Sequence, residues 1–176
     1  MKKKHHVLIV EDEPLMRMSI AESLRHEGYE VTDVNTGSEG LKLAQSKNYD
    51  AVITDLKLPG ADGIEILKAS MRSSPVTQVI IITAYASIQT AVEAMKEGAR
   101  DYLTKPFSTE ELLLILKRSL EYKEMEEENI YLRQQEAKLA VVAKILGNIS
   151  HDVKNLLMPV LTGVKLLDTE LKELFE

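Results

Sequence analysis

Five charged or polar side chains follow directly on, or close behind, short apolar runs of the chain: Glu11, Asp12, Asp55, Thr83 and Lys105. Three of them are carboxylates, which repel one another at close range unless they share a cation. Oxygen ligands with open positions suit Mg²⁺, which keeps water ligands and accepts phosphate oxygens. A carboxylate beside Mg²⁺, with a lysine and a hydroxyl within reach, can attack phosphorus and form an acyl phosphate. These residue types therefore predict a magnesium-dependent phosphoryl-transfer site, provided that the fold brings them together.

Taken singly, each of these residues has a more ordinary explanation. An acidic residue after a strand is usually a helix cap or a solvated loop residue. Lys105 alone is more often a surface lysine, and Thr83 alone an ordinary strand-end residue. The order of an acid pair, a lone aspartate, a threonine and a Lys-Pro step, each near the end of an apolar run, favours one shared site over chance.

The apolar runs themselves have the character of buried strands. They are rich in β-branched residues and continuous rather than alternating, as in strands that are buried on both faces of a parallel sheet. Three strong runs cover residues 6–10, 50–54 and 78–82, and two weaker runs at 29–34 and 100–103 fit strands at or near an edge.

Helical patterns with start and stop signals separate the runs. One carries Met16, Ile20 and Leu24 at four-residue spacing, and another carries Ile88, Val92 and Met95. Capping-box spacings mark three helix starts: Thr36 with Glu39, Asp62 with Glu65, and Ser108 with Glu111. Five strand–helix units in succession predict a doubly wound α/β domain with helices on both faces of a parallel sheet. In such a sheet, functional side chains gather at the carboxyl ends of the strands.

The second half of the chain shows a different periodicity. From residue 108 onward there is no strand pattern, and apolar residues recur at every seventh position: Met125, Leu132, Leu139, Leu146, Val153, Val160 and Leu167. The positions four residues further on are polar early, as at Asn129 and Glu136, and apolar late. This heptad series predicts a long helix that forms a coiled coil or bundle with a weak seam at its start. We expect a homodimer that is parallel along residues 120–150.

Composition narrows the class of protein. The formal net charge is −6, from 22 basic and 28 acidic residues, which argues against a general nucleic-acid binder. There is no cysteine, hence no disulfide, thiol catalysis or cysteine-based zinc site. Unbroken apolar runs of about five residues are far too short for a membrane span. The basic start is followed by too short an apolar stretch for a signal peptide, and we expect a cytoplasmic protein.

Residues 5 to about 122 resemble the receiver domain of two-component response regulators. The resemblance is carried by residues 7–14, 53–63, 82–85 and 101–107. It implies a flavodoxin-like fold with strand order 2-1-3-4-5, in which Asp55 is the phosphoacceptor. It also implies roles for the following residues: Asp12, Asp55 and the backbone carbonyl of Lys57 as Mg²⁺ ligands, Glu11 acting mainly through metal-bound water, Thr83 and Lys105 as contacts of the phosphoryl group, and Tyr102 as a side chain that changes rotamer with phosphorylation. The Lys105–Pro106 bond is expected to be cis.

Residues 148–156 resemble the H-box of histidine-kinase dimerisation and phosphotransfer domains. By that resemblance His151 is the phosphohistidine, Asp152 its acid–base partner and Asn155 the residue that positions water. His151 falls off the apolar stripe and should face solvent, although a surface histidine on an amphipathic helix is the more ordinary reading. Leu156 stands where the family often has proline, and Pro159 should kink the helix. No phosphate-cradling glycine-rich motif occurs, so we expect no ATP binding.

These patterns predict three parts: a receiver at 1–122, a helical coiled-coil linker at 123–145, and a partial histidine-kinase dimerisation and phosphotransfer helix at 146–176. The leading hypothesis is a phosphorelay protein, resembling a fragment of a hybrid kinase, that receives phosphate from a cognate histidine kinase or another phosphodonor. Its receiver would catalyse its own phosphorylation and dephosphorylation. The alternative is a stand-alone receiver whose helical tail only dimerises it. A DNA-binding regulator and a haloacid-dehalogenase-type hydrolase rank lower, because there is no basic recognition helix and no Asp-x-Asp at residues 12–14.

Overall fold

The structure is a computed structural model that describes the backbone of residues 4–174 and the side chains of residues 4–167. The chain divides into two compact units, one ending at Glu127 and the other beginning at Glu128.

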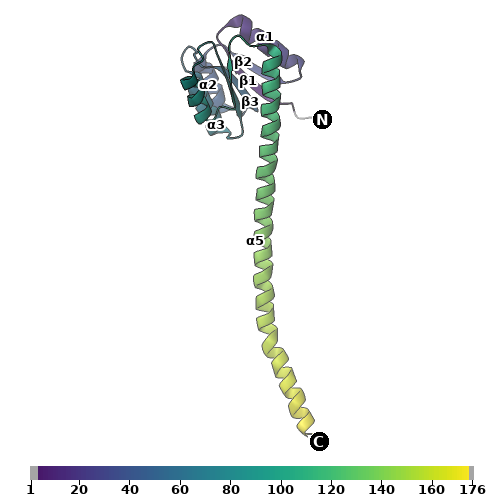
Figure 1. The fold of residues 1–176 in the computed structure, drawn as a ribbon. Coiled ribbons are helices and arrows are strands. Elements are labelled where there is room, and N and C mark those ends of the chain that lie inside the picture. The colour runs from purple at the N-terminus through teal and green to yellow at the C-terminus, as the bar shows by residue number, and fades with distance from the viewer. Residues whose placement is uncertain (1–3, 175–176) are drawn as a thin grey trace. The chain divides into compact units, whose positions relative to one another are not determined.

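The first unit is built on a five-stranded parallel sheet (Figure 1). The strands are β1 (His6–Val10), β2 (Glu30–Val34), β3 (Ala51–Asp55), β4 (Gln78–Thr83) and β5 (Asp101–Thr104). Their order is β2-β1-β3-β4-β5, as the resemblance implied. Asp55 pairs with Ile82 and Thr83 with Thr104, so both site residues lie at the carboxyl edge of the sheet.

Helices alternate with the strands: α1 (Pro14–His26), α2 (Gly37–Ser46), α3 (Gly63–Ser73), α4 (Ile88–Lys96) and α5 (Thr109–Leu174). The capping spacings read from the sequence form at the starts of α2, α3 and α5. Asp62 and Glu65 make a reciprocal box, whereas Thr36 only accepts from the backbone of Glu39. At the start of α5, the backbone nitrogen of Glu111 donates to Ser108 Oγ over 3.1 Å.

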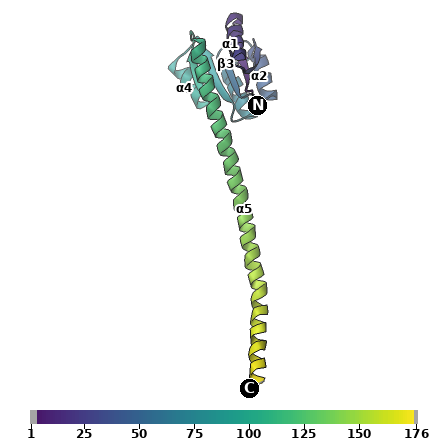
Figure 2. The same ribbon diagram turned by 90° about the vertical axis from the view of Figure 1, so that its right-hand side faces the viewer.

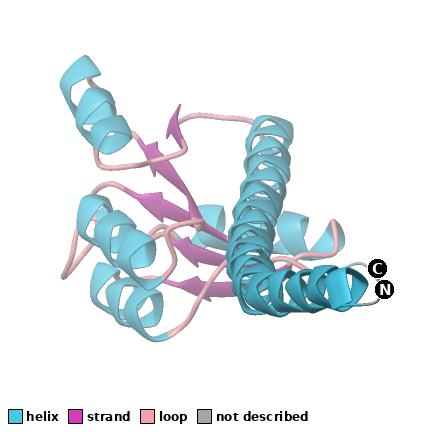
Figure 3. Cartoon of the chain, turned by 90° about the horizontal axis from the view of Figure 1, so that it is seen from below, coloured by secondary structure: helices cyan, strands magenta, loops and turns pink. Residues whose placement is uncertain are grey.

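The helices cover both faces of the sheet (Figure 3). On one face, Ile20 and Leu24 of α1 and Leu112 and Leu116 of α5 pack on side chains of the strands. On the other face α2, α3 and α4 cover a second cluster, centred on Ile66 and Leu67 of α3. Because helices bury both faces of the sheet, the central strands are apolar at successive positions and do not alternate apolar with polar residues.

The helix α4, visible in Figure 2, forms where the sequence pattern placed it, and its apolar periodic residues do not face the core. Its periodic residues Ile88, Val92 and Met95 are exposed, and Ala94 is its one buried residue. Its N-terminus is capped by Ser87 and Thr90, whose side chains each bond the other's backbone nitrogen. Threonine at that position lies outside the Glu/Gln pattern by which such boxes are recognised.

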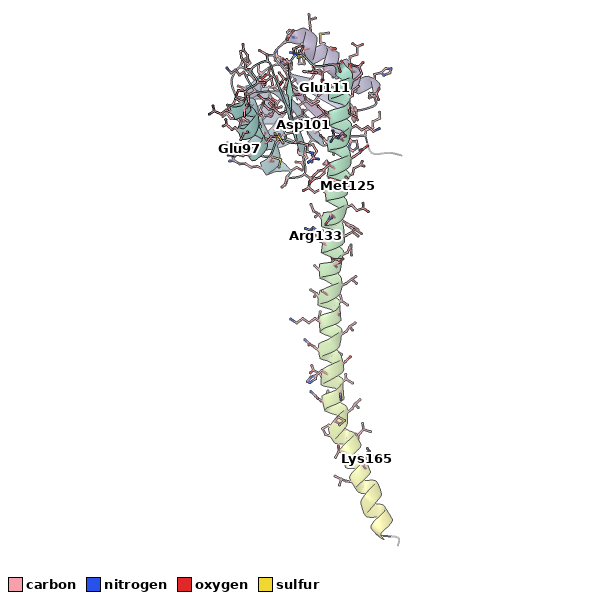
Figure 4. The ribbon with its side chains drawn as sticks, viewed as in Figure 1. Glu97, Asp101, Glu111, Met125, Arg133 and Lys165 are labelled. Carbon is pink, nitrogen blue, oxygen red and sulfur yellow. The ribbon has the colours of Figure 1, made fainter. Side chains whose placement is uncertain are left out.

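The second unit consists, within the described residues, of the part of α5 that follows Glu127. The heptad residues from Leu132 to Leu167 are all exposed in this single chain. Side chains along the segment, including the labelled Arg133 and Lys165, project from the helix (Figure 4). The helix continues through Pro159 to Leu174. Among the described residues, no helix combines the length and the apolar character that a membrane span requires.

Candidate functional site

Three carboxylates meet at the carboxyl edge of the sheet, as their positions after β1 and β3 predicted. One oxygen from each of Glu11, Asp12 and Asp55 lies within 4.8 Å of the others. Glu11 and Asp55 are buried, while Asp12 is exposed and opens the cluster to solvent. An all-oxygen donor set with one solvent-facing side fits Mg²⁺, which retains some of its water ligands in proteins.

Lys105 joins this cluster from the end of β5. Its ammonium nitrogen donates to Asp55 Oδ2 over 2.6 Å and to both carboxylate oxygens of Glu11 over 2.9 and 2.7 Å. The Lys105–Pro106 peptide bond is cis, which confirms the expectation from the receiver resemblance. One lysine therefore neutralises part of the charge of two buried carboxylates.

Burial and hydrogen bonding shift the pKa values of Glu11 and Lys105 in opposite directions. Burial raises the pKa of Glu11 above its ordinary value, although the hydrogen bonds from Lys105 and from the Glu13 backbone pull it down. Burial alone would lower the pKa of Lys105, but its hydrogen bonds to Asp55 and Glu11 outweigh that effect and raise it. Lys105 is therefore a fixed cation at neutral pH.

The loop after β3 is held tightly around Asp55. The backbone nitrogen of Lys57 donates to Asp55 Oδ1 over 3.1 Å, and Gly63 donates to the Leu56 carbonyl over 2.9 Å. A Cβ atom at Gly63 would lie 2.4 Å from the Asp55 carbonyl oxygen. Only glycine permits that approach, and it fixes the backbone from which the Asp55 carboxylate projects.

The two remaining receiver residues lie on β4 and β5. Thr83 is fully buried, and its hydroxyl accepts a hydrogen bond of 3.1 Å from the backbone nitrogen of Tyr85. Tyr102 is half-buried, and its hydroxyl lies 2.9 Å from that of Thr90 in α4. Tyr102 is thus hydrogen-bonded to α4, the helix that follows β4.

Two residues around the site were not found from the sequence. Arg17 in α1 donates to the Glu11 carbonyl over 2.8 Å, which ties that helix to the acidic cluster. Tyr85 places its ring under the Lys57 ammonium, with 4.5 Å between the nitrogen and the ring centroid. The sequence motifs assign no role to either side chain; the first turn of α1 places Arg17, and the approach of the loops after β3 and β4 places Tyr85 beside Lys57.

The three H-box residues lie together on the second unit. His151 Nδ1 lies 3.2 Å from Asn155 Nδ2, one helical turn further on, and 3.5 Å from Asp152 Oδ1. The side chains of His151 and Asp152 are largely exposed. His151 is exposed in the single chain, as are the heptad residues Leu146 and Val153 beside it, and its chemical role stays a prediction.

Comparison with known proteins identifies the first unit. The family model for the response regulator receiver domain matches residues 7–117. A putative NtrX-like response regulator of Rickettsia felis is 37% identical over 150 residues, which is 84% of this chain and 31% of that protein. The chain thus spans about a third of the length of this curated relative.

Solved structures agree with this match. The receiver domain protein from Methanospirillum hungatei has a TM-score of 0.68 at 32% identity, over 70% of this chain and 99% of its own. The beryllofluoride-activated NtrC4 receiver domain, solved as a dimer, has a TM-score of 0.63 at 35% identity, over 67% of this chain and 98% of its own.

Proposed function

Since the chain belongs to the response regulator receiver domain family of two-component systems, we propose that it is phosphorylated on Asp55 and that this state regulates the helical segment after the receiver. The observation that carries the proposal is the position of Lys105, 2.6 Å from Asp55 Oδ2 at the edge of three clustered carboxylates. A cation at that distance both orients the nucleophile and can bind a phosphoryl oxygen.

The reaction requires only positioning and charge neutralisation. An oxygen of the Asp55 carboxylate forms the new bond to phosphorus, and the bond between phosphorus and the donor breaks with its electron pair on the donor. Lys105 then pairs with the phosphoryl oxygens, and the Thr83 hydroxyl donates to one of them. Mg²⁺ held by Asp12, Asp55 and the Lys57 carbonyl, with Glu11 acting through metal-bound water, would supply further neutralisation of these oxygens. The phosphodonor is a cognate histidine kinase or a small acyl phosphate, and the setting is the cytoplasm.

The test is phosphorylation of the full chain by acetyl phosphate with Mg²⁺, followed by intact-mass measurement. We expect one added phosphoryl group on the wild type and no stable addition on Asp55→Asn. Asp62→Asn is the matched control, because it alters a carboxylate of the same loop and asparagine still caps α3. Equal labelling of Asp55→Asn and the wild type would refute the assignment.

A second candidate function concerns His151. Its exposure and its contact with Asn155 favour phosphorylation at the imidazole, as in the kinase H-box. Against this stands the NtrX-like relative, described as a response regulator, whose match extends over 150 residues. A fusion of receiver and kinase helix therefore has no more support than a receiver with a dimerising tail. Supplying a kinase catalytic domain in trans and comparing labelling of the wild type with His151→Gln separates the two.

We also propose that the second unit pairs with the same unit of another copy. Its heptad residues are exposed in the single chain, and burying each Leu or Val contributes about 1.5–3 kcal/mol. A parallel pair of helices covers such a stripe. Pairing through this segment gives the receiver a route by which phosphorylation can act on the helical part.

A further inference from the structure

We propose that Arg17 is a positioning residue of the Mg²⁺ site, where its guanidinium group holds the backbone of Glu11 and Asp12 so that both carboxylates serve one cation. The inference rests on the proposed function, because Mg²⁺ assists the phosphorylation of Asp55 there. The role assigned to Arg17 is indirect, since it acts through the two acidic residues and not on the phosphoryl group itself.

Arg17 lies in the first turn of α1 and connects two separate parts of the first unit. Its Nη1 donates to the Glu11 carbonyl over 2.8 Å and, over a longer 3.4 Å, to the Asp12 carbonyl. Its Nε lies 3.6 Å from Oδ2 of Asp33, near the carboxyl end of β2. A guanidinium presents several donors in a rigid fork, so one group can bind the loop after β1 and the neighbouring strand together. We call Arg17 and Asp33 the arginine strap.

The arginine strap restrains the peptide planes from which the two carboxylates project. The Glu11 carbonyl belongs to the plane before the Asp12 Cα atom and the Asp12 carbonyl to the plane after it, so both backbone dihedral angles of Asp12 are restrained. The plane before the Glu11 Cα atom is held as well, since the Glu11 backbone nitrogen donates to the Val34 carbonyl over 3.1 Å. The directions of the two Cα–Cβ bonds follow from these planes.

Asp12 depends on this restraint more than Glu11 does. The Glu11 carboxylate is buried and accepts hydrogen bonds from the Lys105 ammonium and the Glu13 backbone nitrogen. Asp12 is exposed, and among the residues that the structure describes none donates a hydrogen bond to its carboxylate. Without the arginine strap, the cation would have to order Asp12 on binding, and that ordering reduces the affinity.

The charge of Arg17 and its contacts have opposite effects on a divalent cation. A guanidinium near the site repels Mg²⁺, so removal of the charge alone would tighten Mg²⁺ binding. Removal of a group that orients metal ligands weakens binding, usually by about 10- to 100-fold. The arginine strap predicts a weakening. For Arg17→Met we expect about tenfold, the lower end of this range, because Glu11 remains held by Lys105.

The experiment measures Mg²⁺ binding to the full chain by calorimetric titration, without a phosphodonor. Arg17→Met should raise the Mg²⁺ dissociation constant about tenfold. Arg25→Met is the matched control, since Arg25 also lies in α1 and contacts Asp33 over 2.6 Å, but it does not contact the acid pair. Its dissociation constant should equal that of the wild type. Asp33→Ala leaves the guanidinium in place without its anchor and should weaken binding by a smaller factor than Arg17→Met. It tests the proposal even if Arg17→Met does not fold, which urea unfolding in EDTA determines.

Labelling by acetyl phosphate gives an independent measurement. In Arg17→Met the Mg²⁺ concentration at the half-maximal labelling rate should rise by the same factor as the dissociation constant. The rate at saturating Mg²⁺ should stay within about twofold of the wild type, because the bound cation then orders Asp12. The double variant Arg17→Met, Asp33→Ala should bind Mg²⁺ no more weakly than Arg17→Met, since both changes remove the same restraint.

Three results would overturn the arginine strap: unchanged or tighter Mg²⁺ binding in Arg17→Met or in Asp33→Ala, an equal weakening in Arg25→Met, or a lower rate at saturating Mg²⁺ with an unchanged half-maximal concentration. A wild type that binds Mg²⁺ with the expected differences among variants, but takes no label on Asp55, would overturn the proposed function and leave the arginine strap standing. A labelled wild type whose variants share one dissociation constant overturns the arginine strap alone.

Discussion

The ammonium nitrogen of Lys105 lies 2.6 Å from Oδ2 of Asp55, although the two residues are 50 positions apart in the chain. The same nitrogen also contacts both oxygens of Glu11. Because β1, β3 and β5 are parallel members of one sheet, their carboxyl ends present these three side chains at one edge. The lysine is thus held by two buried carboxylates at the place where phosphoryl oxygens would lie.

Replacing Lys105 should slow phosphoryl transfer without removing the nucleophile. For Lys105→Met we expect the rate of labelling by acetyl phosphate to fall about 100-fold, the usual cost of losing one preorganised charge contact to a transition state. Lys68→Met is the control, since Lys68 pairs with Glu97 on the surface over 3.2 Å, and its labelling rate should not change. A Lys105→Met variant that labels at the wild-type rate would show that the lysine is structural only.

Substitution of Gly63 should disturb both stability and labelling. In Gly63→Ala the added Cβ would meet the Asp55 carbonyl oxygen at 2.4 Å, so the loop must shift, at a cost of about 1–3 kcal/mol. The same change at Gly147 meets no atom within 4 Å and should stabilise its helix by about 1 kcal/mol. Urea unfolding and the labelling rate of both variants test this, and a Gly63→Ala variant that is as stable and active as Gly147→Ala contradicts it.

The ion pair of Lys123 with Asp50 fastens α5 to the start of β3. Lys123 is buried, contacts Asp50 and Glu127, and has its pKa raised because these bonds outweigh the opposing effect of burial. At pH 7 we expect Lys123→Met to lose about 3 kcal/mol of unfolding free energy, since the buried Asp50 carboxylate loses its ion pair with the ammonium group and keeps the hydrogen bond from the His6 backbone nitrogen. The double variant Asp50→Asn, Lys123→Met should recover much of the loss, because neither charge remains.

The same pair predicts how this stability difference depends on pH. A raised lysine pKa means that the folded state holds its proton more tightly, so the stabilisation is complete below the ordinary value of 10.5 and is lost as pH rises through the folded pKa. The difference between wild type and Lys123→Met should therefore be constant from pH 7 to about 9 and shrink above about 10.5. Unfolding curves at a series of pH values check this, and a difference that grows with rising pH would have the wrong sign.

Pairing of the second unit should depend on its apolar stripe. Leu146→Asp places a charge on the heptad face and should convert a dimer into a monomer at micromolar concentration. Asn148→Asp adds the same charge on the opposite side of the helix, because two residues correspond to about 200° of rotation, and should leave the dimer intact. Light scattering measures the oligomeric state of these variants, of the full chain and of a chain that ends at Glu127. We expect the full chain to be a dimer and the shortened chain to be a monomer. A monomeric wild type would remove the coiled-coil proposal.

The sequence was most informative where one physical rule decides position. Glu11, Asp55 and Lys105 were predicted to lie together because the carboxyl ends of parallel strands share one edge of the sheet. The buried strands were predicted from continuous runs rich in β-branched residues. For α4, apolar periodicity predicted the helix but did not show which of its faces meets the sheet. Ala94 is small enough to touch the sheet, whereas Ile88 and Val92 remain outside.

Contacts between loops had no signal of that kind. Lys57 reaches Tyr85 because the loops after β3 and β4 converge in space, and Arg17 reaches back from the first turn of α1 to the Glu11 carbonyl. The helical half shows the converse case. Its heptad predicted the helix that the structure contains, while the proposed pairing with a second copy involves side chains that a single chain does not include.

The most direct measurement of the central claim is the chemical identity of the modified residue. After incubation with acetyl phosphate and Mg²⁺, treatment with borohydride reduces an aspartyl phosphate to homoserine, which peptide mass analysis can locate. We predict homoserine at position 55 in the wild type and none when EDTA removes Mg²⁺ or when Asp55 is replaced by Asn. Homoserine at another aspartate, or phosphate retained on a residue that borohydride does not reduce, would contradict the account.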